Sequence, residues 1–155
     1  MADDQQGHDP RLAALDIFVG AWVEHIDHPA MPDIPDGQVE FAWELDGQYL
    51  LQRSNSPQPE FPDSLTLIAL GDEDGTYLQH YFDTRGVTRL YRMGLRDGIW
   101  KLWRTEPDFS PLDFCQRFEG TFSDDSNSID GRWEQSYDGG TTWKLDFLLT
   151  FTRVG

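Results

Sequence analysis

The residues best suited to chemistry lie between positions 77 and 104, where tyrosine and arginine alternate with apolar side chains. Because alternate residues of a β-strand point to the same side, three strands over this stretch would present two distinct faces. Arginine supplies a forked donor and tyrosine an orienting hydroxyl, a combination typical of receptors for planar or amphipathic carboxylates. The first face carries Tyr77, Gln79, Tyr81, Arg89, Tyr91, Met93, Leu102 and Arg104.

Which of the two faces lies inside the protein decides which residues form a site. A hairpin between the first two strands places Tyr81 opposite Arg89, and the next hairpin pairs a further tyrosine with a further arginine on the same face. The second face has His80 as its polar centre and is somewhat more apolar, so the pattern leaves both orientations open. The candidate ligand-binding residues are Tyr77, Tyr81, Arg89, Tyr91, Arg104 and His80.

A second candidate for chemistry is the stretch GAWVEHIDH, which contains His25 and His28. Residues three apart on a strand point to opposite faces, and no cysteine or further histidine completes a ligand set. Cys115 is expected on a strand face outside the aromatic core, without a histidine near enough to act as its base. We therefore predict no metal site, no reactive thiol and no cofactor.

Turn signals show how these residues must be positioned. Six Asp-Gly dipeptides separate runs of Val, Ile, Tyr, Phe, Trp and Thr, and Asp-Gly between such runs is the strongest short hairpin signal. Sequential hairpins of this kind form an antiparallel meander. The predicted strands cover residues 20–26, 38–45, 48–55, 64–71, 76–83, 87–95, 99–105, 113–123, 128–137 and 142–153.

For a meander of ten strands in 155 residues, the favoured arrangement is a sheet closed on itself, because closure removes the exposed edges. The pattern PRLAALDIF predicts a short helix before the first strand, with Asp9 as its N-cap. We expect an all-β, up-and-down barrel with a short N-terminal helix. Residues 10–155 would form this one domain, and residues 1–9 a disordered tail.

Charge pairing across the last three strands tests this interpretation. Turns near residues 124–127 and 138–140 would place Arg117 opposite Glu134 and Arg132 opposite Asp146, all on one solvated outer face. The same registers pair Glu119 with Arg132 and Glu134 with Lys144. The opposite, inward face would carry Phe114, Phe118, Trp133, Trp143, Leu145 and Phe147.

The composition limits the partners. A formal net charge of −16 argues against binding nucleic acid or anionic membranes, which would repel the protein at long range. No run of 18 apolar residues occurs, and the single cysteine cannot form an internal disulfide, so we expect a reducing cytoplasm. The acidic, lysine-poor composition fits either salt adaptation or a GC-rich genome.

The sequence resembles the calycins, the superfamily of lipocalins, fatty-acid-binding proteins and nitrobindins. The resemblance rests on Gly20-Ala21-Trp22 entering the first strand after a short helix, and on Arg153 near the end of the last strand. In calycins such a Trp packs against a late Arg where the barrel closes, which implies that Trp22 and Arg153 form a structural barrel-closing pair.

The later strands look like those of the bacterial DUF1579-type proteins, in the segments FDTRGVTRLYRMGLRDGIWKLWR and GRWEQSYDGGTTWKLDF. Arg89-x-Tyr91 is also similar to the Arg-x-Tyr pair that holds a carboxylate in fatty-acid-binding proteins, although it lies here on a middle strand. Nitrobindins bind haem through a histidine in the last strands, and residues 131–155 contain no histidine.

Three functions stay open on this evidence. The first is a binding protein that holds a small apolar or amphipathic molecule, possibly a carboxylate, inside the barrel. The second is an enzyme of lyase, cyclase or isomerase type that uses the Tyr/Arg cluster, with Glu44 or Glu106 as acid. The third is a filled barrel acting as an interaction module, and association of the barrel into a homodimer is a further expectation.

Overall fold

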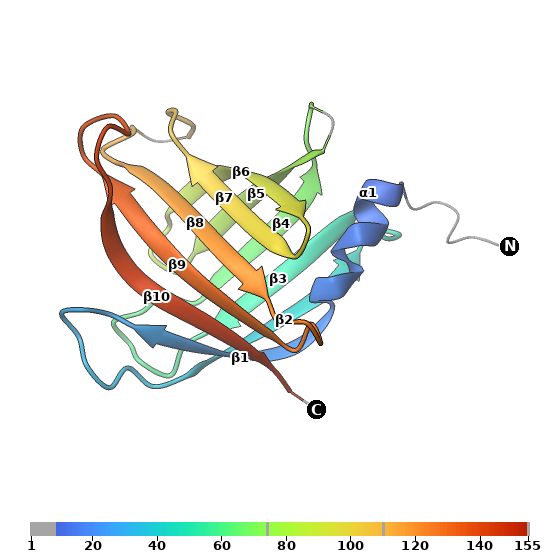
Figure 1. The fold of residues 1–155 in the computed structure, drawn as a ribbon, viewed down its shortest axis with the longest axis horizontal. Coiled ribbons are helices and arrows are strands. Elements are labelled where there is room, and N and C mark those ends of the chain that lie inside the picture. The colour runs from blue at the N-terminus through green and yellow to red at the C-terminus, as the bar shows by residue number, and fades with distance from the viewer. Residues whose placement is uncertain (1–8, 74, 110, 155) are drawn as a thin grey trace, which may run out of the picture.

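A computed structural model describes residues 9–73, 75–109 and 111–154, in which ten antiparallel strands close into one barrel (Figure 1). Each strand pairs with its neighbours in the sequence, and β1 pairs with β10 to complete the ring. The strands are β1 (Gly20–Asp27), β2 (Gly37–Glu44), β3 (Tyr49–Asn55), β4 (Ser64–Leu70), β5 (Thr76–Asp83), β6 (Thr88–Arg96), β7 (Ile99–Arg104), β8 (Cys115–Phe122), β9 (Ser128–Ser136) and β10 (Lys144–Arg153).

This architecture confirms the predicted ten-stranded meander with a short N-terminal helix. The hairpin at Asp97-Gly98 shows why the Asp-Gly signal works, since both residues have positive φ, of 53° and 75°. Two successive residues in this conformation give the turn whose twist matches that of the flanking strands. Disorder was predicted for residues 1–9, of which residues 1–8 lie outside the described residues.

One end of the barrel is closed by α1 (Pro10–Ala13) and the 3₁₀ helix η2 (Ala14–Phe18), which lie against it (Figure 1). Asp9 caps α1 by accepting a hydrogen bond from the Arg11 backbone N–H at 2.9 Å. The apolar side chains Leu12, Leu15 and Phe18 are almost fully buried and join the barrel core. The helical segment therefore forms a floor to the barrel interior.

Arg153 ties this floor to the place where the barrel closes. Its guanidinium lies 4.1 Å from the Trp22 ring and donates to the carbonyl oxygens of Val19 and Ile17, each at 2.7 Å. The Trp22 indole N–H in turn donates to the Phe18 carbonyl at 2.8 Å. One side chain thus joins β10, β1 and the connection from the helical segment.

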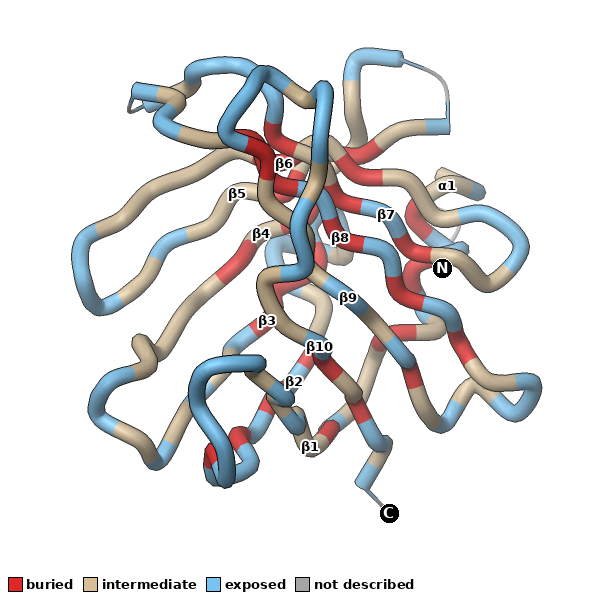
Figure 2. The backbone as a smooth tube through the Cα atoms, turned by 60° about the vertical axis from the view of Figure 1, so that its left-hand side comes forward, coloured by how far each residue is buried: buried red, intermediate tan, exposed pale blue. Residues whose placement is uncertain are grey.

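The structure also decides which face of the middle strands is inside. Buried and exposed positions alternate along the strands, as Figure 2 shows, and the buried ones include Tyr77, Gln79 and Tyr91. The first face therefore points inward. His80 has the opposite orientation and lies on the outer face, beside Leu67 and Leu90 of the neighbouring strands.

The predicted charge register is confirmed between β8 and β9 and is wrong between β9 and β10. Arg117 lies opposite Glu134 as expected. The last hairpin begins one residue out of the predicted register, with Leu145 rather than Lys144 opposite Glu134. A bulge between Leu145 and Phe147 adds a second residue, so that Leu148 rather than Asp146 lies opposite Arg132.

The one-residue offset of this hairpin changes the environment of three residues that the predicted register had assigned. Asp146 turns toward the barrel interior instead of the outer face. Leu145 and Trp143 leave the predicted inner face: Leu145 is 39 % exposed, and Trp143 lies under the Arg117 guanidinium at 4.1 Å on the outside.

Replacing the closing arginine tests the importance of this contact. We expect Arg153→Met to lower the free energy of unfolding by about 3 kcal/mol, because the charged hydrogen bonds to backbone carbonyls disappear. Arg132→Met is the control, since that side chain is half exposed and pairs only loosely with Glu134 at 3.6 Å. Urea denaturation of both variants measures the difference, and equal stabilities would contradict a closing role.

Candidate functional site

Above the floor, the barrel encloses a cavity of about 360 Å³ lined by side chains from β1 and from β3 to β10. A water molecule occupies about 30 Å³ in the liquid, so the space has room for about twelve groups of that size. Its aromatic lining includes Phe118, Trp133 and Phe147. The polar lining is unusually rich for a protein interior and includes Glu24, Gln52, Thr66, Gln79, Tyr81, Arg89, Tyr91, Gln116 and Asp146.

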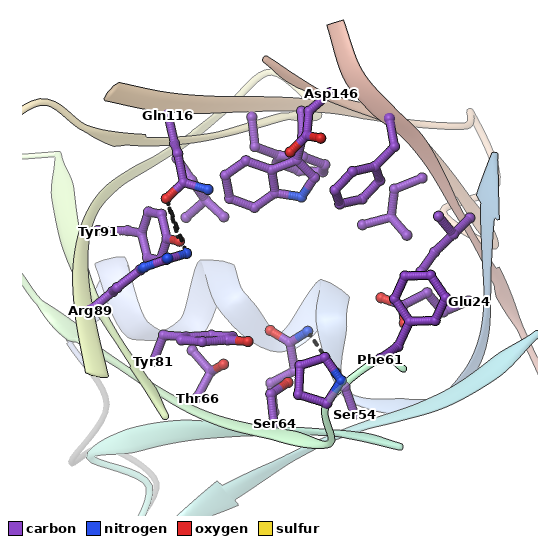
Figure 3. A pocket seen from close by; sticks show the side chains of 18 of the residues that line it. Glu24, Ser54, Phe61, Ser64, Thr66, Tyr81, Arg89, Tyr91, Gln116 and Asp146 are labelled. Carbon is purple, nitrogen blue, oxygen red and sulfur yellow. Dashed lines mark hydrogen bonds between the residues drawn. The ribbon is translucent and has the colours of Figure 1, made fainter. Parts of the chain in front are cut away.

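One wall carries a cation and two hydrogen-bonding groups. The Gln116 side-chain oxygen accepts from the Tyr91 hydroxyl at 3.0 Å and from the Arg89 guanidinium at 3.4 Å (Figure 3). Burial raises the pKa of Tyr91, so its hydroxyl keeps the proton that it donates. Arg89 also lies 5.8 Å from the Phe114 ring, and no ion pair joins it to a carboxylate of the described residues.

Two carboxyl groups line other parts of the cavity, and Figure 3 shows Glu24 across the cavity from Arg89. Burial alone raises the pKa of Glu24 to about 7. Burial also raises the pKa of Asp146, and this rise is opposed by His28, whose Nε2 atom lies 3.9 Å from the carboxylate. Glu24 is therefore a group that can hold or release a proton near neutral pH.

The structure separates the predicted ligand-binding residues into four groups. Tyr81, Arg89 and Tyr91 line the cavity together. Tyr77 lies at the floor, where its hydroxyl donates to the Arg11 carbonyl at 2.6 Å. His80 is on the outer face, away from the cavity lining.

Arg104, the remaining predicted ligand residue, points inward but is held in an ion pair. Its guanidinium contacts both carboxylate oxygens of Asp108, at 2.7 and 3.0 Å. Asp108 also accepts the Leu90 backbone N–H at 2.9 Å. The pair fastens the connection after β7 onto β6, so the charge of Arg104 is neutralised by the protein itself.

Sequence reasoning did not identify the two cavity carboxyls. Glu24 could have been found, because it follows the inward-facing Trp22 by two residues on the same strand. Asp146 had no such signal, since its inward direction follows from the one-residue offset of the last hairpin. Glu44 and Glu106, the acids considered from the sequence, are both exposed.

The two histidines of the first strand contact different partners. His25 Nδ1 lies 2.8 Å from Asp36, and His28 Nδ1 accepts the Ala30 backbone N–H at 3.0 Å. In residues 9–73, 75–109 and 111–154, no three His, Cys, Asp or Glu side chains gather as metal ligands. Cys115 is buried at the beginning of β8, opposite Ser136.

Comparisons with known proteins relate the chain to other barrels by fold. No family model matches the sequence, and no curated protein matches it either. The crystal structure of Rv2717c from M. tuberculosis superposes with a TM-score of 0.64 at 12% sequence identity, covering 95% of this chain and 99% of that one. This likeness and the closed ten-strand meander fit a calycin-like barrel.

The resemblance to the DUF1579-type proteins gains no support from these comparisons and stays a prediction. The part of the chain that the structure describes contains no helix long and apolar enough to cross a membrane.

The raised pKa of Glu24 predicts a pH-dependent stability. In the unfolded chain this carboxyl ionises near its ordinary value of 4.5, and in the folded protein near 7. Its contribution to stability is therefore present at low pH and is lost as the pH rises toward 7. We expect Glu24→Gln to gain stability over the wild type between pH 4.5 and pH 8, by up to about 3 kcal/mol.

Denaturant midpoints of wild type and variant at several pH values measure this gain. Glu40→Gln is the matched control, because Glu40 is exposed on the outer face of β2 opposite Arg53. A difference between wild type and Glu24→Gln that does not change with pH would contradict the buried position of this carboxyl.

Proposed function

We propose that the protein binds a small amphipathic carboxylate inside the barrel, with the carboxylate on Arg89. The observation that carries this proposal is the Arg89 guanidinium in the cavity lining. Its hydrogen-bond partner is a neutral group, the Gln116 side-chain oxygen, which also accepts from the Tyr91 hydroxyl. Charged groups withdrawn from water are stabilised by an opposite charge with good hydrogen-bond geometry. A carboxylate offers two acceptor oxygens to the fork of Arg89 and can accept from the neighbouring Tyr91 hydroxyl as well.

The remainder of the lining suits the apolar part of such a molecule. Phe61, Phe118, Trp133 and Phe147 supply contact area, and ligand pockets typically combine such surfaces with a few orienting polar groups. Arg104 provides an internal comparison, because it has its own carboxylate partner in Asp108 while Arg89 has a glutamine. The volume matches a molecule of about twelve non-hydrogen atoms, such as decanoate.

The proposal is tested by removing the cation while keeping the strand. We expect Arg89→Met to weaken binding of decanoate by about 10- to 100-fold, the value of one or two charge-assisted hydrogen bonds. Arg92→Met is the matched control, since Arg92 lies on the same strand with the opposite orientation and pairs loosely with Asp72 at 3.6 Å. Isothermal titration calorimetry with decanoate and decanol measures both effects.

Wild-type protein should prefer decanoate to decanol, and Arg89→Met should lose that preference while Arg92→Met retains it. Equal binding of acid and alcohol by the wild type would refute recognition through Arg89. No measurable binding of either molecule would count against a carrier of medium-chain amphiphiles.

A second candidate is proton-transfer chemistry on a molecule bound in the same cavity. The observation that favours it is Glu24, whose pKa of about 7 suits a general acid or base at neutral pH. Incubating wild type and Glu24→Gln with unsaturated decanoates and following double-bond position by mass spectrometry tests this candidate. Isomerisation by the wild type alone would support it, and unchanged substrate in both would leave binding as the function.

A further inference from the structure

Glu24 is a carboxyl of the cavity lining that the protein itself leaves without a counter-charge. It is half-buried, and in the part of the chain that the structure describes no hydrogen bond or ion pair joins its carboxyl to another residue. Its neighbours across the sheet are Gly37 of β2 and Phe151 of β10, which carry no polar side chain. Burial raises its pKa, and no nearby charge or donor opposes that rise.

The space beside this carboxyl is kept open by a glycine. A Cβ atom at Gly37 would lie 3.4 Å from the Glu24 Oε1 atom and 2.8 Å from the Asn55 carbonyl oxygen, so a larger residue would crowd both groups. Phe61, from the connection after β3, also lines the cavity and lies on the same side of it as Glu24 in Figure 3. This wall therefore combines a carboxyl with an aromatic ring, and both can attract an ammonium group.

Glu24 and Arg89 belong to opposite walls of the barrel. In the closed ring of strands, β1 and β6 are separated by four strands in either direction. Inward side chains of two such strands approach the cavity from opposite sides, as Figure 3 shows for Glu24 and Arg89. A molecule that placed a carboxylate on Arg89 could therefore direct its other end toward Glu24.

The uncompensated charges of the cavity lining are one of each sign. Arg85 pairs with Asp83 at 2.6 Å, and Asp146 has a histidine nitrogen 3.9 Å from its carboxylate, which leaves Arg89 and Glu24. A charge withdrawn from water is costly unless an opposite charge accompanies it. A simple anion would match Arg89 alone, and it would approach a protein whose formal net charge is already −16.

We propose that Glu24 binds an ammonium group and that the ligand is an amphipathic zwitterion, with its carboxylate on Arg89 and its amine on Glu24. This inference rests on the proposed function, since the carboxylate end is assigned there. The apolar chain between the two ends contacts the aromatic lining. Such a molecule has no net charge, so the acidic protein does not repel it at long range.

The proton on Glu24 reports which group binds beside it. An ammonium group stabilises the ionised carboxyl and lowers its pKa from about 7, so that binding at neutral pH releases a proton. A carboxylate that brings no amine adds negative charge to the cavity and raises this pKa, so its binding takes up a proton. The two classes of ligand are therefore distinguished by the sign of the proton exchange.

The test compares ω-amino acids with alkanoates of the same size by calorimetry at neutral pH, in buffers of different ionisation enthalpy. The pairs are 6-aminohexanoate with heptanoate, 8-aminooctanoate with nonanoate, and 10-aminodecanoate with undecanoate, in which an ammonium group replaces a methyl group. We expect the best amino acid to bind about tenfold more tightly than its matched alkanoate, the value of one charge-assisted hydrogen bond. We also expect it to release protons on binding.

Two variants assign this preference to its residue. Glu24→Gln keeps the size of the side chain but cannot ionise, so it should lose both the preference for the amino acid and the proton release. This variant is expected to be more stable than the wild type, so the loss would not reflect unfolding. Asp27→Asn is the matched control, because it removes the same charge from an exposed position of β1 with the opposite orientation, and it should retain both.

Dependence on Arg89 separates the ammonium subsite from the proposed function. Alkanoates that bind at least as tightly as the matched amino acids, with affinity lost in Arg89→Met, would overturn the subsite and leave the proposed function intact. Amino acids that bind the wild type and Glu24→Gln equally well would also overturn the subsite. Failure of every ligand to bind would overturn both.

Discussion

The structure depends on the closure of the sheet between β1 and β10. Six residue pairs join these strands, and Arg153 fastens the junction by stacking on Trp22 and donating to carbonyls of the preceding connection. An arginine suits this position because its planar fork reaches several acceptors while its face covers an indole ring. Closure leaves no open sheet edge and places a helical floor under the interior, so every inward residue lies in a space bounded on all sides but one.

The interior is divided into a packed part and a hollow part. Near the floor, Phe18 packs edge to face on Trp100, as Trp22 does on Phe151, and Trp100 and Phe151 contact each other at a tilt. Beyond them the inward positions carry amides, hydroxyls, carboxyls and the Arg89 guanidinium, which a packed core could not hold without large desolvation costs. A cavity with such a lining is compatible with a bound molecule.

Local irregularity determines part of the site. The register of the last hairpin turns Leu145 outward and Asp146 inward, near His28, and the bulge that follows lets Phe147 face the interior as well. The electrostatic asymmetry of the cavity, with Arg89 on one wall and acidic groups on others, depends in part on this register. Bulges commonly re-aim a side chain beside functional sites in this way.

Much of the architecture was determined by the sequence itself. Asp-Gly turns and alternating apolar residues specify a meander of ten strands, and strand alternation puts Tyr81, Arg89 and Tyr91 on one face, because turn chemistry and side-chain direction are local properties. The tertiary structure alone decided that this face is inside, that Arg104 is neutralised by Asp108, and that Asp146 enters the cavity. These outcomes depend on closure of the barrel, on a loop folding back and on a register shift. Each brings together residues whose contact no local sequence pattern predicts.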